Sequence, residues 1–245
     1  MIQINEISSY IARNPAKIVI LKKNDPSVLT EVIKPFPDID FLKQFATSYY
    51  WSNSESVNIF DVVGNACQEY QGFSWLSLLS VGKKMSHNLS LLATNPWYYF
   101  EQKKKEPEMR YTKVNDEVYV SGEGNHRTAI CKVLFYYVGH TVIYGITYDE
   151  YKIDYALLNS FCKLNTLLRD KFPYIELKLI RINTRREDAP GWYRNYYEHS
   201  LLLVNHKKNK QIELASDEID LAYNYFLKAN FFNRIFVGSK IKIIM

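Results

Sequence analysis

The sequence predicts an α+β fold in two parts, a mainly helical N-terminal region over residues 1–94 and a mixed α+β domain over residues 95–245. In the first part, apolar residues recur mostly at intervals of three and four, which is the spacing of one helix face. From Asn95-Pro96 onward, short apolar and alternating runs typical of strands separate the helical patterns. Helices and strands mixed in this way predict a mixed sheet with helices packed against it.

The N-terminal region predicts three helical stretches and one strand. Ile4, Ile7 and Ile11 share one helix face, and this helix is expected to end near Pro15. The apolar run "KIVILKK" predicts a strand over residues 17–23, and the three prolines within residues 26–37 predict a loop. The other two helical predictions are residues 39–51, with Phe41, Phe45 and Tyr49 on one face, and most of residues 56–97, with breaks near Gly72 and Gly82.

The second part begins with a predicted hairpin over residues 108–122, because two alternating runs meet at the turn pair Asn115-Asp116. The segment 127–138 is apolar on nearly every face, which predicts a buried helix closed by Gly139. Further along the chain, the same reasoning predicts a strand over 140–146, a helix over 149–171, a strand over 175–182, a hairpin over 200–215, a helix over 217–232 capped by Ser216, and an edge strand over 239–245.

Composition limits the classes of function. The chain is 47% hydrophobic with a net charge of +5, so we expect a globular protein whose charge permits a polyanionic partner without requiring one. The cysteines Cys67, Cys131 and Cys162 have no CxxC spacing, so no zinc site is expected. Their odd number and the lack of a secretory signal predict a cytoplasmic protein, and the lack of a long apolar run predicts no membrane partner.

The segment "VYVSGEGNHRTA" places a strand, a glycine turn and a helix start in succession. The first N–H groups of a helix have no partner within it, and glycines let a backbone approach a phosphate closely. We therefore expect Gly122, Gly124 and Asn125 to contact a phosphate, with Arg127 as a bidentate clamp. The other predicted contacts are His126, which could donate to a phosphate or move a proton, and Thr128, which could cap the helix or touch a metal-bound water.

A purely structural interpretation is also open, in which the two glycines serve an ordinary turn and His126 and Arg127 are surface residues. The same choice exists for Glu123, which lies between the glycines. As a catalytic residue it would polarise a water or an acceptor hydroxyl, and as a structural one it would be an exposed acid near a helix dipole.

At these residues the sequence resembles the ParB/sulfiredoxin superfamily. In "GNHRTAI", Gly124, His126 and Arg127 match the superfamily's nucleotide-binding motif, and Ala129 matches its small residue. The preceding hairpin, the strand after the helix and an upstream "TNPWYYF" segment also agree with it. The resemblance implies a ParB/sulfiredoxin-like sheet, a nucleotide ligand such as ATP or CTP, and Mg²⁺ as cofactor. No direct protein cluster for the metal is expected.

Two departures narrow what the resemblance implies. Asn125 stands where sulfiredoxins carry their catalytic cysteine, which excludes sulfinic-acid reduction. No helix-turn-helix reader follows the motif, which argues against a centromere-binding protein. The members that remain are phosphotransferases and plasmid- or phage-borne ATPases and nucleases. The first hypothesis is therefore a nucleoside-triphosphate phosphohydrolase coupled to DNA cleavage, with Glu123, His126 and Arg127 as catalytic residues.

A second candidate surface concerns DNA. Arg185, Arg186, Trp192 and Arg194 combine cations with an aromatic side chain, which can hold phosphates and stack on bases. The alternative is that "APGWYRNYYEHS" begins a helix whose aromatics enter the core. Two other functions stay open: a small-molecule kinase on the same scaffold, and an antibacterial or phage effector that binds a cognate protein partner while the loop holds a ligand without turnover.

Overall fold

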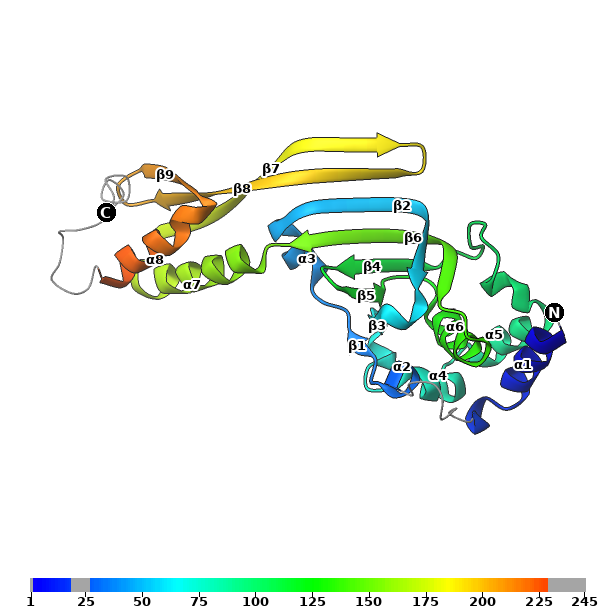
Figure 1. Cartoon of the computed structure of the whole chain (residues 1–245). Coiled ribbons are helices and arrows are strands. Elements are labelled where there is room, and N and C mark those ends of the chain that lie inside the picture. Colours follow the sequence, from blue (N-terminus) through cyan, green and yellow to red (C-terminus); the bar gives the residue numbers. More distant parts are fainter. Residues whose placement is uncertain (1, 19–26, 229–245) are drawn as a thin grey trace. The chain divides into compact units, whose positions relative to one another are not determined.

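The computed structural model describes residues 2–18 and 27–228, and the chain divides into two compact units. The first combines Met1–Asp38, Tyr50–Tyr151 and Asp188–Tyr193, and the second combines Ile39–Tyr49, Lys152–Glu187 and Arg194–Met245. Both units contain residues from either side of position 94, so they do not follow the division expected from the sequence. The α+β class is confirmed, since helices accompany a mixed sheet (Figure 1).

The first unit contains most of six strands of the mixed sheet. In spatial order these are β1 (Lys34–Pro35), β3 (Val62–Asn65), β5 (Glu117–Val120), β4 (Arg110–Val114), β6 (Val142–Ile153) as far as Tyr151, and β2 (Ala46–Asn58) from Tyr50 onward. The neighbours β1 and β3, β3 and β5, and β4 and β6 run parallel. The strands β4 and β5 run antiparallel, as the predicted hairpin requires, and Asn115 in their turn has a φ of 53°.

Helices of the first unit pack together beside this sheet (Figure 1). They are α1 (Ile2–Arg13), α2 (Ser27–Thr30), α4 (Trp75–Val81), α5 (Met85–Thr94) and α6 (Asn125–Val138), with short 3₁₀ turns η1 (Pro15–Lys17), η3 (Ile59–Asp61), η4 (Gln68–Tyr70) and η5 (Pro96–Tyr99). The prediction of a buried helix is confirmed by α6, in which every residue from Thr128 to Tyr136 is buried. Gly139 closes α6 in the left-handed conformation, with a φ of 74°.

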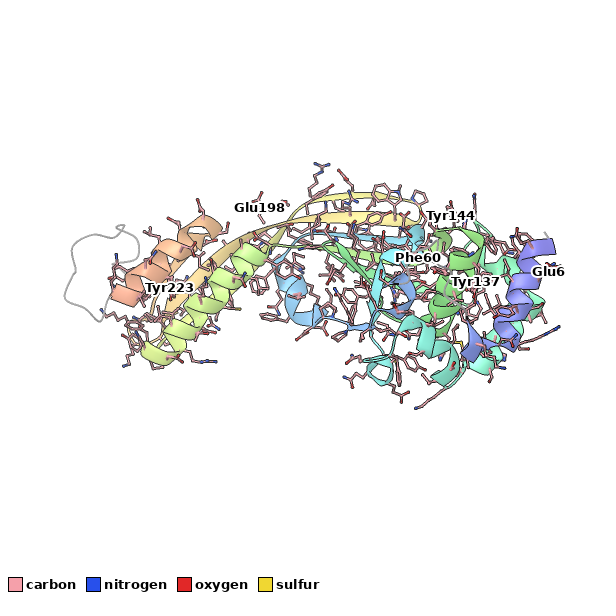
Figure 2. The ribbon with its side chains drawn as sticks, turned by 60° about the horizontal axis from the view of Figure 1, so that its bottom comes forward. Glu6, Phe60, Tyr137, Tyr144, Glu198 and Tyr223 are labelled. Carbon is pink, nitrogen blue, oxygen red and sulfur yellow. The ribbon has the colours of Figure 1, made fainter. Side chains whose placement is uncertain are left out.

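The second unit pairs helices with a long hairpin. Its elements are α3 (Ile39–Leu42), η2 (Lys43–Phe45), α7 (Tyr155–Lys171), β7 (Ile175–Ala189) as far as Glu187, β8 (Trp192–Asn205) from Arg194 onward, β9 (Lys210–Ala215), η6 (Ser216–Glu218) and α8 (Ile219–Lys228). The predicted hairpin on the basic run is confirmed by the antiparallel pair β8 and β9. Leu157, Leu164 and Leu168 are among the buried residues of α7, and α7 packs against α8. Figure 2 shows the side chains, including Tyr223 on α8 and Glu198 on β8.

Three helical predictions were wrong where strands form instead. The predicted helix over 39–51 stops at η2, and β2 continues from Ala46, because aromatic and hydroxyl side chains fit a half-buried pleated surface. Residues 149–153 belong to β6, and α7 starts only after Asp154, whose carboxylate accepts a hydrogen bond of 2.9 Å from the Leu157 N–H. Residues 62–65 form β3 in the middle of a stretch predicted to be mostly helical.

A fourth correction concerns "APGWYRNYYEHS". This segment does not begin a helix; it forms the turn between β7 and β8 and the first half of β8. Gly191 in the turn has a φ of 93°, which permits the chain to reverse there. Residues 19–23 of the predicted strand over 17–23 lie outside the described residues. The whole of the predicted edge strand over 239–245 also lies outside them. Ser216 begins η6 instead of capping α8, and Glu218 accepts from the Ala215 N–H.

Candidate functional site

A pocket of about 560 Å³ opens in the first unit where β5 passes into α6. All residues from Gly122 to Arg127 line it, so the structure brings the predicted loop to a cavity. The other walls come from η4, from the start and one face of α5, from η5 and from the segment before β4. Those walls contain Cys67, Glu69, Tyr70, Lys83, Lys84, His87, Asn88, Leu91, Leu92, Asn95, Tyr98, Tyr99, Glu106 and Pro107.

The loop backbone presents hydrogen-bond donors. Gly124 is the N-cap of α6 with a φ of 120°, a conformation that side-chain-bearing residues rarely adopt. A Cβ there would also lie 3.3 Å from the Met109 Cγ, whereas one at Gly122 would make only ordinary contact with Arg110. Thr128 N–H makes the first helical bond, to Gly124, so within residues 2–18 and 27–228 the N–H groups of Asn125, His126 and Arg127 have no hydrogen-bond partner.

A second helix start lies on the same pocket. Lys84 is the N-cap of α5, and the pocket-lining residues His87, Asn88, Leu91 and Leu92 follow on one face of that helix. The Lys83 ammonium pairs with a Glu69 carboxylate oxygen at 2.6 Å. Lys84, in contrast, is exposed and has no carboxylate within ion-pair distance in the described part of the chain. Its positive charge is therefore available to an anion in the pocket.

His126 is held from two sides. Its Nε2 lies 2.9 Å from the Tyr70 hydroxyl oxygen, and the two rings meet edge-on with centroids 5.4 Å apart. Gly82 lies against the adjacent ring atom, Cδ2. A Cβ at Gly82 would be only 2.8 Å from the His126 Cδ2, so a side chain there would collide with the ring. Burial lowers the pKa of His126, as do the positive charges of Lys84 and Arg127, while Glu123 opposes them. The imidazole is accordingly neutral near pH 7.

Arg127 does not hold the position expected of a free phosphate clamp. Its Nη1 donates to the Tyr98 hydroxyl at 2.7 Å and to the Pro107 carbonyl, and its Nη2 donates to the Glu108 carbonyl at 2.7 Å. The guanidinium therefore ties α6 to η5 and to the segment before β4. Three of the five N–H groups of the guanidinium, both on Nη1 and one on Nη2, therefore bond to this wall.

The wall segment is fixed at a second point. Lys105 N–H donates to the Gly145 carbonyl of β6 at 2.7 Å, and Gly145 has a φ of 70°. A Cβ at Gly145 would lie 1.9 Å from the Lys103 carbonyl oxygen, so the segment crosses β6 where no side chain exists. The Lys105 ammonium is buried and donates to the Glu101 carbonyl at 2.6 Å.

The role predicted for Thr128 was wrong. Its side chain is fully buried beneath the loop, and its hydroxyl lies 2.8 Å from the Tyr111 hydroxyl. Neither a ligand in the pocket nor a water on a metal can reach it. Asn125 does line the pocket, and its Oδ1 is buried without a partner among the described residues. Glu123 is exposed at the pocket, as expected for a residue between two glycines in a turn.

The residues predicted for DNA lie on the neighbouring strands β7 and β8. Arg185 lies over the Tyr196 ring at 4.8 Å and pairs with Glu187, and Arg186 is exposed on β7. Arg194 and Trp192 lie on β8, and the ring centroid of Trp192 lies 6.0 Å from that of Tyr50.

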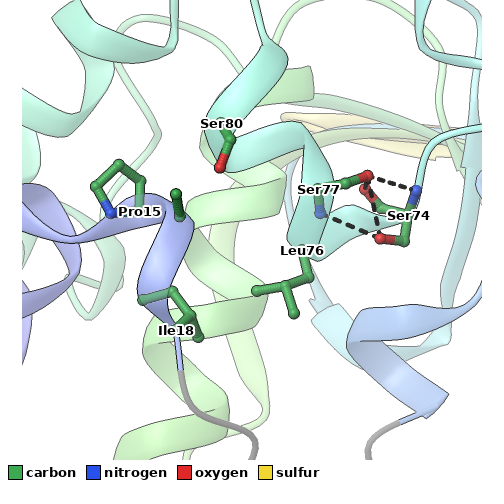
Figure 3. A pocket seen from close by; sticks show the side chains of 7 residues that line it. Pro15, Ile18, Ser74, Leu76, Ser77 and Ser80 are labelled. Carbon is green, nitrogen blue, oxygen red and sulfur yellow. Dashed lines mark hydrogen bonds between the residues drawn. The ribbon is translucent and has the colours of Figure 1, made fainter.

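A smaller pocket of about 220 Å³ contains three serine hydroxyls (Figure 3). Ser74 and Ser77 form a reciprocal capping box at the start of α4, with side-chain to backbone bonds of 2.9 and 3.1 Å. The hydroxyls of Ser74 and Ser77 thus serve to cap α4. The larger pocket remains the candidate site.

Some pocket residues were not found from the sequence. Tyr70 and Lys84 belong to turns that the helical reading of residues 56–97 merged into one stretch. The face of α5 did carry a signal, since His87, Asn88, Leu91, Leu92 and Asn95 recur at helical spacing. The described residues contain no group of three or more histidine, cysteine or acidic side chains placed to hold a metal ion.

Within residues 2–18 and 27–228, no helix has both the length and the apolar character needed to cross a bilayer. Comparison with protein-family models, curated proteins and solved structures gave no match, so what is said of this site follows from its own geometry.

Proposed function

We propose that this pocket binds a nucleoside triphosphate and that the chain hydrolyses it, as a phosphohydrolase of ParB/sulfiredoxin type. One observation carries the proposal: the starts of two helices, α5 and α6, lie on the same pocket together with the unpaired cation Lys84. The first N–H groups of α6 have no partner among the described residues, whereas at α5 the Met85 N–H donates to the Gly82 carbonyl at 2.9 Å. Both helix starts carry a partial positive charge. Two such starts favour a ligand with several anionic groups over a single phosphate.

The rest of the pocket suits the nucleoside. The lining includes the exposed side chain of Leu91 and the largely buried side chains of Leu92 and Tyr99, which are apolar or aromatic. A volume of about 560 Å³ falls within the usual range for small-molecule sites. A ligand with a charged end and a flat, partly apolar end would therefore match both halves of the lining. This match supports a nucleotide over inorganic polyphosphate.

The proposed hydrolysis uses groups of the chain itself. The loop N–H groups and Lys84 would neutralise the phosphate charge, and Glu123 at the pocket would orient the attacking water. The described residues do not provide a protein-only Mg²⁺ site, so Mg²⁺ would enter with the phosphates, to which it commonly binds. Coupling to DNA cleavage remains a prediction that depends on the arginines of β7.

The proposal is tested by titrating wild-type protein with ATP, CTP, GTP and ADP in the presence of Mg²⁺, by calorimetry and by phosphate release. We expect binding of at least one triphosphate, lost in Gly124→Val, whose side chain would strain the loop backbone. Binding without phosphate release would support the effector alternative. Phosphate transfer only in the presence of an acceptor would support the kinase. No binding of any nucleotide would overturn the proposal.

A further inference from the structure

Tyr70 and Gly82 together determine which edge of the His126 ring faces the pocket. The Tyr70 hydroxyl occupies Nε2 at 2.9 Å, and Gly82 lies against Cδ2, the adjacent ring atom. These two atoms form one edge of the imidazole. The opposite edge carries Nδ1, which has no hydrogen-bond partner in the described part of the chain. Nδ1 is therefore the nitrogen left for a ligand.

The direction of the bond between Tyr70 and His126 follows from the chemistry of the two groups. Burial raises the pKa of Tyr70, so the phenol keeps its proton and can donate it. The hydroxyl oxygen lies 2.9 Å from Nε2, and a phenol is a stronger hydrogen-bond donor than acceptor, whereas an unprotonated imidazole nitrogen is a strong acceptor. The hydroxyl proton therefore points toward Nε2. A neutral imidazole that accepts at Nε2 carries its own proton on Nδ1.

We infer that Tyr70 is a positioning residue that holds His126 as the Nδ1–H tautomer, so that Nδ1–H donates a hydrogen bond to a phosphate oxygen of the bound nucleotide. The inference rests on the proposed function for its ligand, but the tautomer itself does not depend on it. It decides between the two roles that the sequence leaves open for His126. The residue donates to a phosphate, and it does not accept a proton from water at Nε2, because Tyr70 occupies that atom.

The charges around the ring agree with this role. Lys84 and Arg127 both disfavour an imidazolium, and Glu123 is the acid that favours one. A neutral donor in this position adds a directed hydrogen bond without another buried positive charge. Lys84 would supply the positive charge that attracts the phosphate, and the His126 hydrogen bond would fix the orientation of the phosphate.

The tautomer is measured first, on free protein with ¹⁵N-labelled histidine. Nitrogen chemical shifts distinguish a protonated ring nitrogen from an unprotonated one, and His126→Asn identifies the signal. We expect a protonated Nδ1 and an unprotonated Nε2 in the wild type, and a mixture of both tautomers in Tyr70→Phe, which keeps the ring but removes the donor. A protonated Nε2 in the wild type would overturn the inference, whatever the protein binds.

The contact with the ligand is then tested with two amide variants. The amide nitrogen of asparagine can take the place of Nδ1, and that of glutamine the place of Nε2. We expect His126→Asn to bind the nucleotide nearly as well as the wild type and His126→Gln to bind about tenfold more weakly, the effect of one hydrogen bond to a charged group. The reverse order would overturn the inference. Thermal unfolding of each variant establishes that the fold is retained.

If the wild type shows the Nδ1–H tautomer but binds no nucleotide, the proposed function fails and the donation to phosphate fails with it, while the positioning by Tyr70 stands. If nucleotides bind but the tautomer is Nε2–H, the positioning fails and the proposed function stands. The two measurements therefore separate the inference from the function on which it rests.

Discussion

The Nη1 of Arg127 donates a 2.7 Å hydrogen bond to the Tyr98 hydroxyl, which joins the first turn of α6 to η5. The same guanidinium also lies 5.9 Å from the centre of the Tyr98 ring. Burial raises the pKa of Tyr98, and Arg127 opposes that effect. An arginine held by an aromatic hydroxyl and two backbone carbonyls shapes the pocket wall before any ligand is bound.

Arg127→Lys tests this bracing role. Lysine keeps the charge but cannot bond to Tyr98, Pro107 and Glu108 together, so we expect a loss of about 2 kcal/mol in the free energy of unfolding. Amide hydrogen exchange in residues 101–108 should be faster. Arg169→Lys, which changes an exposed arginine paired with Asp170, is the matched control. Unchanged exchange together with lost nucleotide affinity would assign Arg127 to the ligand instead.

Lys84→Gln tests the unpaired cation at the start of α5. We expect the dissociation constant for the triphosphate to rise about tenfold at low salt, and by less at high salt, because salt screens an exposed charge. The free energy of unfolding should stay within about 0.5 kcal/mol of wild type, as for most surface substitutions. Lys163→Gln on α7, also exposed, should leave the affinity unchanged. Equal affinities for the two variants would remove Lys84 from the site.

Lys132 provides a prediction about stability and pH. Its side chain is 1% exposed, its ammonium lies 5.2 Å from the centre of the Trp75 ring, and burial lowers its pKa to about 8. The unfolded chain binds a proton at this lysine up to a pH near 10.5, so between pH 8 and 10.5 it holds more protons than the folded chain. The lysine's contribution to stability therefore rises with pH across this window.

Lys132→Met removes the buried charge at similar volume. We expect the variant to be more stable than wild type at pH 7, by up to about 3 kcal/mol, and this advantage to shrink between pH 8 and 10. Urea unfolding of both proteins at each pH measures the difference and cancels the contribution of the tyrosines, including Tyr148, whose pKa burial raises. A difference that does not change with pH would mean that Lys132 titrates normally in the folded protein.

The exposed arginines of β7 provide a prediction about DNA. If they contact phosphates, Arg186→Ala should weaken duplex binding and reduce the slope of log affinity against log salt by about one. Fluorescence anisotropy at several salt concentrations measures both quantities. Arg169→Ala again serves as the control. An unchanged slope would show that Arg186 does not contact nucleic acid. The pair Arg185-Arg186 would then serve only the solubility of an exposed strand.

Local signals in the sequence were sufficient for the centre of the site. The turn pair Asn115-Asp116, the continuous apolar run of α6 and the closing Gly139 each depend on residues close together in the chain, and each prediction was confirmed. The loop between β5 and α6 follows from them. Its place on a cavity agrees with the expectation that it faces a ligand.

Contacts between residues far apart in the chain could not be predicted from such local signals. Whether Arg127 faces a ligand or a wall depends on Tyr98 and Pro107, which are distant in sequence and carry no local mark of the contact. Thr128 was misassigned because helix periodicity did not reveal the Tyr111 hydroxyl beneath it. The strand β2 was missed because its aromatic residues also suit a helix face, and its pairing in the sheet decides between the two.

Gly145 has a consequence for how this chain can change through evolution. Any side chain there would collide with the backbone of Lys103, and a backbone cannot move aside as a side chain can. A relative that lacks this glycine must have rerouted the whole crossing segment, and with it the carbonyls that hold Arg127. In an alignment, positions 127 and 145 should therefore vary together. A distant relative that has both Arg127 and Gly145 would share this pocket wall. A relative without Gly145 would have a different wall.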